Sequence, residues 1–302
     1  MKVAHKPRLK GLKSPQFNMT LSEATFLGAL NCVLILISIV PYVVILVILS
    51  SGKDYSSDSY RIMFHLGVAD CIQLVMQFPP SIWHVIGGND FHFVGNKLFG
   101  SFLNAGWISY VILTLLLAVN RLLTMVGGAK AEEFIIGRYL GAFITVCWIW
   151  GFVFFVAYLT PHLQIAYNPA SMIWVYAGNE PIHSTTRKIA IYSALAEIVL
   201  TALAYIVICC YLCYGSHCDR KHLLMNQSKR AGRVRKREIR ILLQAVLIAG
   251  FAMLVLIYWN YYWVLFSDTK WVFYIANLLW ILNGGVNPAI YLALNRQVFS
   301  QN

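Results

Sequence analysis

The sequence predicts an all-α protein, a bundle of seven transmembrane helices with its N-terminus outside the cell. The 302 residues are 59% hydrophobic and only 12% charged, whereas soluble domains carry about 25% charged residues. The apolar residues gather in seven runs, each long enough for the ~20 residues that a spanning helix needs. Lys and Arg residues gather between these runs, mainly on one side of the expected bundle.

The seven predicted spans account for more than half of the chain. They are residues 27–50, 62–86, 98–125, 138–160, 188–214, 240–266 and 271–294. We therefore expect an extracellular N-tail over residues 1–26 and one seven-helix domain over residues 27–302, with a short C-terminal segment. The N-tail is not followed at once by a short apolar stretch and a small-residue cleavage site, so no cleaved signal peptide is expected.

Orientation follows from the basic residues, which favour the cytoplasmic side of a membrane. Fifteen of the 24 Lys and Arg residues fall on the side of the loops after spans one, three and five, with a dense cluster between Lys229 and Arg237. The five basic residues of the N-tail argue the other way. Asn18 begins an Asn-Met-Thr glycan acceptor sequence, which functions only if the N-tail is extracellular.

Prolines interrupt three of the expected helices because each removes a backbone donor. Pro41 lies in span one, Pro79 and Pro80 in span two, and Pro288 in span seven shortly after Gly284 and Gly285. In hydrocarbon each freed backbone group must find a partner inside the protein. We therefore expect span seven to be a broken helix, buried against its neighbours and able to move.

Charged residues inside the spans are few, and such residues are usually functional. They are Asp70 in span two, Arg121 at the end of span three and Glu197 in span five. We expect Asp70 to pair with the amides of Asn283 and Asn287, which would form a polar pocket at mid-membrane for water or a small cation. The alternative is a neutral, protonated Asp70 that serves only to hold helices together.

The seven cysteines all lie in or beside the spans, so no extracellular disulfide is expected. Cys209, Cys210 and Cys213 end span five, and Cys218 follows. Cysteines next to a membrane can be acylated. They can equally be small core residues, and the sequence leaves both interpretations open.

Four motifs stand in a fixed order along the chain. They are Leu66-x-x-x-Asp70 in span two, Arg121 closing span three, a tryptophan in span four, and Asn287-Pro288-x-x-Tyr291 in span seven. This order resembles that of a divergent rhodopsin-like G-protein-coupled receptor. The phrases from Tyr60 to Asp70 and from Leu117 to Arg121 look most like the nematode serpentine chemoreceptors of class T or class X.

Several family features are missing from this chain. Asn120 replaces the usual acid before Arg121, and Asn96 or Lys97 stands where a cysteine is expected near the start of span three. The loop over 161–187 holds no partner cysteine. Spans five and six lack their prolines, and Trp259 stands where a Cys-Trp-x-Pro motif would be expected.

The resemblance implies a chemosensory receptor in the plasma membrane. It would cross the lipid bilayer several times, bind a small molecule between the outer helix halves and activate a heterotrimeric G protein. The implied coupling and switch residues are Asn120, Arg121, Glu238, Asn287, Pro288 and Tyr291. Asp70 falls on the acid of the family's sodium site, and with Asn283 and Asn287 it would form a polar core and possible sodium site. The implied ligand-binding residues, chosen by depth, are Gln77, Leu103, Asn104, Trp107, Glu197, Tyr258, Tyr261, Tyr274 and Asn277.

A ligand-gated cation channel or small-solute transporter with its N-terminus inside is the alternative. It fits the basic N-tail but would place the cluster at 229–237 outside, against the positive-inside rule. No inverted repeat supports a transporter. A retinal pump would need a lysine inside span seven, and Lys270 lies only at its edge. The sequence offers no nucleophile–base set or metal spacing for an enzyme, and we expect no cofactor other than sodium and no nucleic-acid partner.

Overall fold

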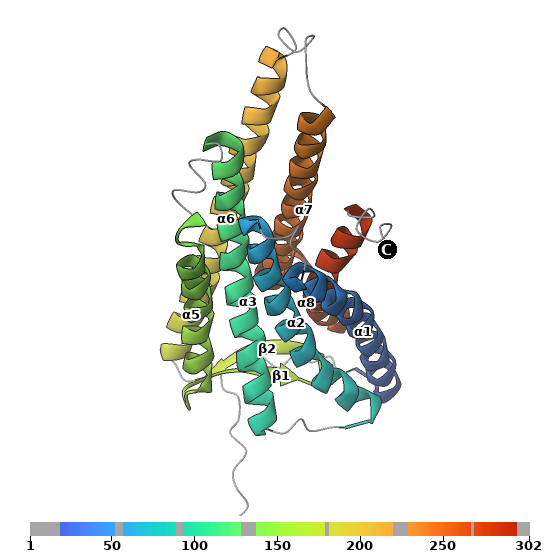
Figure 1. The fold of residues 1–302 in the computed structure, drawn as a ribbon. Helices are drawn as coiled ribbons and strands as arrows, with labels where there is room; N and C mark the ends of the chain where they lie inside the picture. Colours follow the sequence, from blue (N-terminus) through green and yellow to red (C-terminus); the bar gives the residue numbers. More distant parts are fainter. Residues whose placement is uncertain are drawn as a thin grey trace, which may run out of the picture.

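Seven α-helices form one bundle in the computed structural model (Figure 1), which describes residues 19–51, 57–88, 93–127, 137–178, 181–219, 229–266 and 269–294. They are α1 (Leu21–Ser51), α2 (Asp58–Val85), α3 (Phe93–Leu122), α5 (Leu140–Leu159), α6 (Ile182–Asp219), α7 (Lys229–Leu265) and α8 (Lys270–Leu294). A π-helical turn, η2 (Leu123–Gly127), continues α3, and the strands β1 (Leu163–Asn168) and β2 (Ile173–Gly178) connect α5 to α6. The predicted seven-helix bundle is confirmed.

Six helices of the described residues are long and apolar enough to cross a membrane. The exception is α8, which has 25 residues but carries Asn277, Asn283, Asn287 and two glycines among its apolar residues. These amides are all buried. The bundle therefore shields the polar side of α8, and that helix does not need an apolar surface all round.

The largest difference from the predicted spans is at α7, which begins at Lys229 and not at residue 240. The basic stretch from 229 to 239, expected as a loop, is helical. Lys, Arg and Ala are strong helix formers, and residues 229 to 239 contain no proline, so the helix continues past the membrane boundary despite Gly232. In Figure 1, α6 and α7 accordingly extend beyond the other helices at one end of the bundle.

The expected break in span seven is not present, because α8 is helical throughout Lys270–Leu294 with Pro288 inside it. Gly284 and Gly285 have a different role, which is close packing. A Cβ atom on Gly284 would lie 2.8 Å from Leu74 of α2, and one on Gly285 would lie 2.5 Å from the hydroxyl of Ser38 of α1. The two glycines thus allow α8 to lie directly against α1 and α2.

The starts of α1 and α8 are tied together by an ion pair. The backbone amide of Thr20 donates to Glu23 at 2.9 Å and the amide of Glu23 donates to the Thr20 hydroxyl at 3.3 Å, which is a capping box. The same carboxylate accepts a hydrogen bond of 2.6 Å from Lys270. The carboxylate therefore both caps α1 and fixes α8 beside it.

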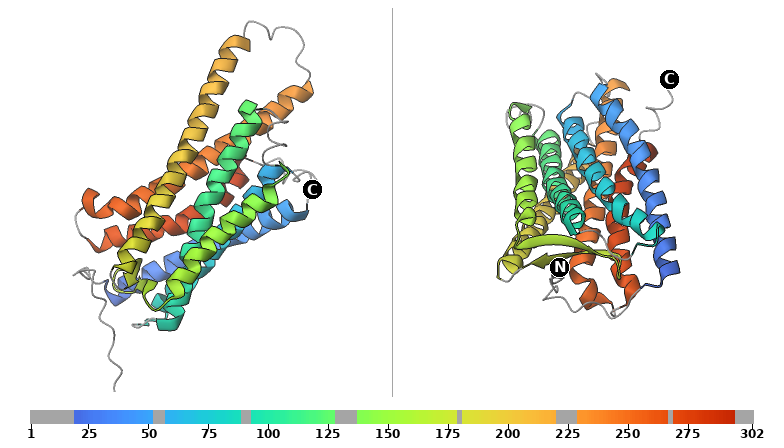
Figure 2. Two further views of the ribbon diagram at one scale, coloured as in Figure 1. Left: turned by 90° about the vertical axis from the view of Figure 1, so that its left-hand side faces the viewer. Right: turned by 90° about the horizontal axis from the view of Figure 1, so that it is seen from below.

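The strands β1 and β2 form an antiparallel hairpin in the segment that was expected to be a loop. Leu163 pairs with Gly178 and Asn168 with Ile173. The side chain of Asn168 accepts a hydrogen bond from the amide of Ala170 in the turn at 3.0 Å. Figure 2 shows the hairpin lying across one end of the bundle, opposite the end where α6 and α7 protrude. We call these the hairpin end and the opposite end.

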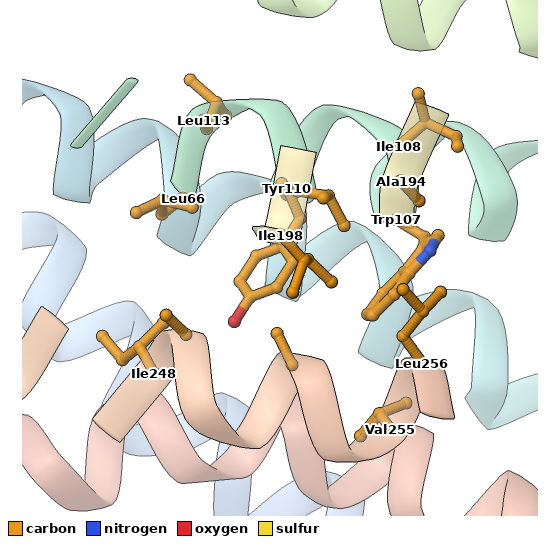
Figure 3. Close-up of a cluster of buried hydrophobic side chains, with 14 of the residues drawn as sticks. Leu66, Trp107, Ile108, Tyr110, Leu113, Ala194, Ile198, Ile248, Val255 and Leu256 are labelled. Atoms are coloured by element: carbon orange, nitrogen blue, oxygen red, sulfur yellow. The ribbon is translucent and has the colours of Figure 1, made fainter. Parts of the chain in front are cut away.

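The core runs between α2, α3, α6 and α7 along the length of the bundle. Figure 3 shows Leu66 of α2, Tyr110 of α3, Ile198 of α6 and Ile248 of α7 converging there. All four are buried, with Tyr110 at 0% exposure. The functional groups described next border this apolar core.

Candidate functional site

Asp70 is fully buried in α2 and its carboxylate accepts hydrogen bonds from three side chains. The hydroxyl of Tyr42 donates to Oδ2 at 2.6 Å, and the amide of Asn287 donates to the same oxygen. The amide of Gln73 donates to Oδ1 at 3.5 Å. Asp70 thus connects α1, α2 and α8, and the expected pairing with Asn287 is present.

Asn283, the other expected partner of Asp70, is buried but makes no such bond. Neither of its amide atoms has a hydrogen-bond partner among the described residues, although the Tyr110 hydroxyl lies close to it. The side-chain oxygen of Asn287 is likewise buried without a partner in the described part of the chain. The amide oxygen of Asn287 therefore stays unused on a side chain that already binds the carboxylate.

The side-chain oxygens of Asn283 and Asn287 are candidate ligands for the sodium ion that the resemblance implies. Hard cations take oxygen ligands, and the oxygens of Asn283 and Asn287 are the right type. An ion would have to share Asp70 with the donors Tyr42, Gln73 and Asn287. The donor set is compatible with a cation, and the ion stays a prediction.

A hydrogen bond extends this polar cluster toward the hairpin end. The indole N–H of Trp280 in α8 donates to Oε1 of Gln73 at 2.8 Å. Gln73 in turn donates to Asp70. A continuous chain of side chains therefore runs from Trp280 through Gln73 and Asp70 to Asn287.

Trp280 also forms part of the wall of a small cavity between α3, α6, α7, α8 and the hairpin. Its lining residues are Trp107, Ile108, Tyr176, Ala190, Ile191, Ala194, Val255, Leu256, Trp259, Asn260 and Trp280. Figure 3 shows Trp107, Ile108, Ala194, Val255 and Leu256 grouped at this place. The cavity measures about 30 Å³, whereas pockets for small ligands measure about 300–1,000 Å³. The described conformation is therefore closed to an organic ligand.

Three aromatic contacts close the cavity. The rings of Trp259 and Trp280 meet edge to face with centroids 5.3 Å apart. Trp107 meets Trp280 at 6.0 Å, and Tyr176 meets Trp259 at 6.1 Å, again edge to face. The indole nitrogen of Trp259 is buried and has no hydrogen-bond partner within the described residues. The indole N–H of Trp259 is thus a buried donor left unused in the aromatic wall.

Only Trp107 among the nine expected ligand residues lines this cavity. Gln77 and Asn104 instead bind the hairpin: Gln77 accepts a hydrogen bond from Trp174 at 2.8 Å, and Asn104 accepts one from Tyr176 at 3.4 Å. Both amides are buried. Their visible role in this conformation is to position β2 over the bundle.

The remaining six expected ligand-binding residues are spread over the bundle. Tyr274 donates to Asn31 of α1 at 3.0 Å, and Tyr258 donates to the backbone of α8 at 3.2 Å. Tyr261 is 47% exposed on the outer surface, whereas Leu103 and Asn277 are buried. Glu197 lies beside Trp150 of α5. Ligand contact by these residues stays a prediction.

Tyr176, Trp259 and Trp280 are the aromatic residues of the cavity that were not predicted as ligand residues from the sequence. Trp259 carried a signal, because it stands where a tryptophan motif of span six is expected. Trp280 showed no sequence signal for a place in the cavity, because it lies within an apolar run. Tyr176 belongs to the hairpin that was expected to be a loop, so nothing placed it beside α7.

The hairpin covers the cavity and is anchored without a disulfide among the described cysteines. Trp174 is fully buried, and His84 of α2 shares a hydrogen bond of 3.0 Å with the hydroxyl of Tyr167. Arg187 lies 5.7 Å from the ring centroid of Tyr176. Burial raises the pKa of Tyr176 to about 12 despite this nearby cation, so the phenol stays protonated and can donate to Asn104.

The comparisons with known proteins agree on the architecture. The solved structure of squid rhodopsin superposes with a TM-score of 0.81 at 13% identity, over 99% of this chain and 91% of the rhodopsin chain. No protein of curated function matches the sequence. The family model "Serpentine type 7TM GPCR chemoreceptor Srt" matches residues 13–301. The chain belongs to the Srt family.

Of the two classes suggested by the sequence, class T is therefore the right one. Membership makes the protein a multi-pass membrane receptor and not an enzyme. The rhodopsin likeness, at 13% identity, supports the fold alone. The cavity of this Srt receptor lies between the helices and beneath the hairpin.

The opposite end of the Srt receptor holds the expected switch residues. Arg121 is 3% exposed at the end of α3 and lies close enough to Tyr205 of α6 for an electrostatic interaction. Asn120 accepts a hydrogen bond from Ser59 of α2. Tyr291 of α8, three residues after Pro288, is buried. The side chain of Glu238 and the whole of Asn18 lie outside what the structure describes.

Proposed function

We propose that this Srt receptor is a plasma-membrane chemoreceptor that binds a small, mainly apolar molecule and activates a heterotrimeric G protein. The observation that carries the proposal is the hydrogen-bonded chain from Trp280 to Asn287. It joins a wall of the cavity to the asparagine of the motif that resembles the family's switch. A change at the cavity therefore has a physical route to the opposite end.

The proposed orientation places the hairpin end outside the cell. The first turns of α7 carry six Lys and Arg residues between Lys229 and Arg237, and Figure 1 places the start of α7 at the opposite end. Basic residues favour the cytoplasmic side. The cavity would then face the outside, and Arg121 would face the G protein.

The chemistry of the cavity supports a class of ligand. Its walls are aromatic and aliphatic, and the unused donor is the indole N–H of Trp259. A neutral molecule with an apolar body and one hydrogen-bond acceptor, such as a ketone, ester or ether, would satisfy that donor. Entry requires the aromatic rings to separate, so such a ligand would shift the population from the closed conformation to an open one.

The test is expression in a heterologous cell with a G-protein readout. We expect responses to neutral ketones, esters or ethers and weaker responses to hydrocarbons of the same size. Trp259→Phe should lower the potency of acceptor-bearing compounds about five- to tenfold, the value of one hydrogen bond. Potency for hydrocarbons should not change. Responses to charged compounds alone would contradict this ligand class.

Arg121→Ala is the control for coupling. The variant should reach the cell surface, bind the same compounds and give no G-protein signal. A full response from it would show that Arg121 is not the coupling residue. The two variants thus separate ligand recognition at Trp259 from signalling at Arg121.

A further inference from the structure

A second cavity opens between α6 and α7, on the outer surface of the bundle. It measures about 340 Å³, within the range of about 300–1,000 Å³ typical of ligand pockets. Its lining residues are Ile198, Ala202, Tyr205, Ile206, Cys209, Cys210, Val246, Ala249, Gly250 and Met253. Ile206 is 56% exposed, and both cysteines and Gly250 are exposed. We call this cavity the α6–α7 groove.

Small residues create the space. Ala202 on α6 faces Ala249 and Gly250 on α7 across the groove. A Cβ atom added to Gly250 would meet nothing within 4 Å, so the glycine is not required by close helix packing. The groove is thus an opening left in the helix contact, and in a bilayer it faces lipid chains.

Cys209 stands at one end of this groove on a continuous helix face. Ile198, Ala202, Tyr205 and Cys209 follow the spacing of four, three and four residues that aligns side chains along one side of a helix. Side chains of a helix point back toward its N-terminus. A chain attached to the sulfur of Cys209 would therefore run over Tyr205 toward Ala202, along the groove.

Tyr205 forms part of the inner wall of the groove. Its side chain is 5% exposed, and its hydroxyl has no hydrogen-bond partner in the part of the chain that the structure describes. Tyr205 lines the same groove one turn before Cys209. Arg121 of α3 lies close to this buried side chain, so Tyr205 offers its ring to the groove as an apolar wall.

We propose that Cys209 is S-acylated and that its fatty chain occupies the α6–α7 groove. The Cys209 sulfur would attack the carbonyl carbon of a fatty acyl-coenzyme A. A new carbon–sulfur bond forms, the bond to the coenzyme A sulfur breaks, and the cysteine proton ends on the released coenzyme A thiol. The thiol of Cys209 is free and exposed, close to the end of a span that runs to Leu212.

The α6–α7 groove favours a fatty chain bonded to Cys209 over the chain of a free membrane lipid. Moving a lipid chain from the bilayer into an apolar groove gains no hydrophobic free energy, because both surroundings are apolar. A chain fixed at Cys209 is present at a high effective concentration. The proposal relies on the orientation given under Proposed function, which puts Cys209 on the side of cytoplasmic acyl-coenzyme A, but not on ligand binding or G-protein coupling.

The experiment uses the full chain expressed in animal cells fed a fatty acid that carries an alkyne tag and a photoreactive diazirine near its end. We expect the label on Cys209 by peptide mapping of the wild-type protein, and its release by hydroxylamine, which cleaves thioesters. Cys209→Ser should lose the label, whereas the matched variants Cys210→Ser, Cys213→Ser and Cys218→Ser should keep it. An unlabelled wild type, a label that resists hydroxylamine, or a label that persists in Cys209→Ser would overturn the assignment.

Irradiation then tests where the chain lies. Crosslinks should form to α7 between Val246 and Met253 in the wild type. Gly250→Leu places a side chain in the open space and should abolish these crosslinks while leaving Cys209 labelled. Crosslinks to lipid alone in the wild type would show that the chain lies outside the groove. These readouts need no ligand, so their failure is distinguishable from failure of the proposed receptor function.

Discussion

The side chain of Asn96 in α3 holds the backbone of Tyr167 in β1 with two hydrogen bonds. The amide nitrogen donates to the Tyr167 carbonyl at 3.1 Å, and the amide oxygen accepts from the Tyr167 N–H at 2.6 Å. Asn96 stands near the position where the family resemblance calls for a cysteine. The next residue, Lys97, donates to the backbone carbonyl of Thr160. Polar side chains therefore fix the hairpin at the place where the family resemblance calls for a disulfide that this sequence lacks.

Replacing Asn96 should loosen the hairpin. Asn96→Ala removes both bonds and should lower the free energy of local opening by about 2 kcal/mol. Amide hydrogen exchange over 163–178 would then accelerate about 30-fold, because exchange reports local opening. Asn96→Asp keeps the acceptor for the Tyr167 N–H and should have a smaller effect. Unchanged exchange in Asn96→Ala would mean that other contacts hold the hairpin.

Gly100 allows the hairpin to approach α3. A Cβ atom there would lie 2.1 Å from the backbone oxygen of Ile165, so Gly100→Ala must displace β1. We expect a loss of about 1–3 kcal/mol in stability, measured as a lower midpoint of thermal unfolding in detergent. Gly141→Ala is the matched control, since its Cβ atom meets nothing within 4 Å. Equal midpoints for the two variants would refute the steric argument.

Trp280 should control basal signalling. The bond from Trp280 to Gln73 exists in the closed conformation, and Trp280→Phe removes it while keeping an aromatic wall. A loss of about 1 kcal/mol would shift the equilibrium away from the closed state about fivefold. Ligand-independent signalling should therefore rise by a similar factor in a surface-expressed variant. Trp271→Phe is the matched control on α8: Trp271 is 46% exposed and does not line the cavity, so this variant should leave basal signalling unchanged.

A sodium ion near Asp70 would stabilise the purified receptor. If the ion binds beside the oxygens of Asn283 and Asn287, the unfolding temperature should be higher in sodium chloride than in equimolar potassium chloride. Asp70→Asn removes the charge and should abolish the difference. Equal unfolding temperatures for the wild type in the two salts would contradict sodium binding, and Asp70 would then interact only with its three hydrogen-bond donors.

Glu238 is expected to pair with Arg121 in the resting receptor. Its position follows from the sequence, since it lies on α7 just after the basic cluster. Glu238→Ala should raise basal G-protein signalling, and Glu238→Gln should give an intermediate value because an amide can still accept a hydrogen bond. Wild-type basal activity in both variants, at equal surface expression, would remove the pair from the mechanism.

The sequence contains only part of the information that is needed to predict the hairpin. Alternating residues such as Ile165 and Tyr167, and the Asn168-Pro169 turn, are typical of a β-hairpin. Yet the segment is short, and its strands are anchored by Asn96, Gln77 and Asn104 from distant helices. Because these contacts join residues that are far apart in the chain, the local sequence pattern alone predicts a loop for this segment.

The sequence by itself determined the seven-helix bundle and limited the expected partners of Asp70 to Asn283 and Asn287, of which Asn287 forms the bond. Long apolar runs are local signals, and a buried charge restricts its partners to the few amides at its depth. The tertiary structure alone decided which side chains border the cavity. It turned Trp280 inward and Tyr261 outward. The reason is that a helix with apolar residues all round carries no clear signal for its rotation, so the rotation is set by how neighbouring helices pack.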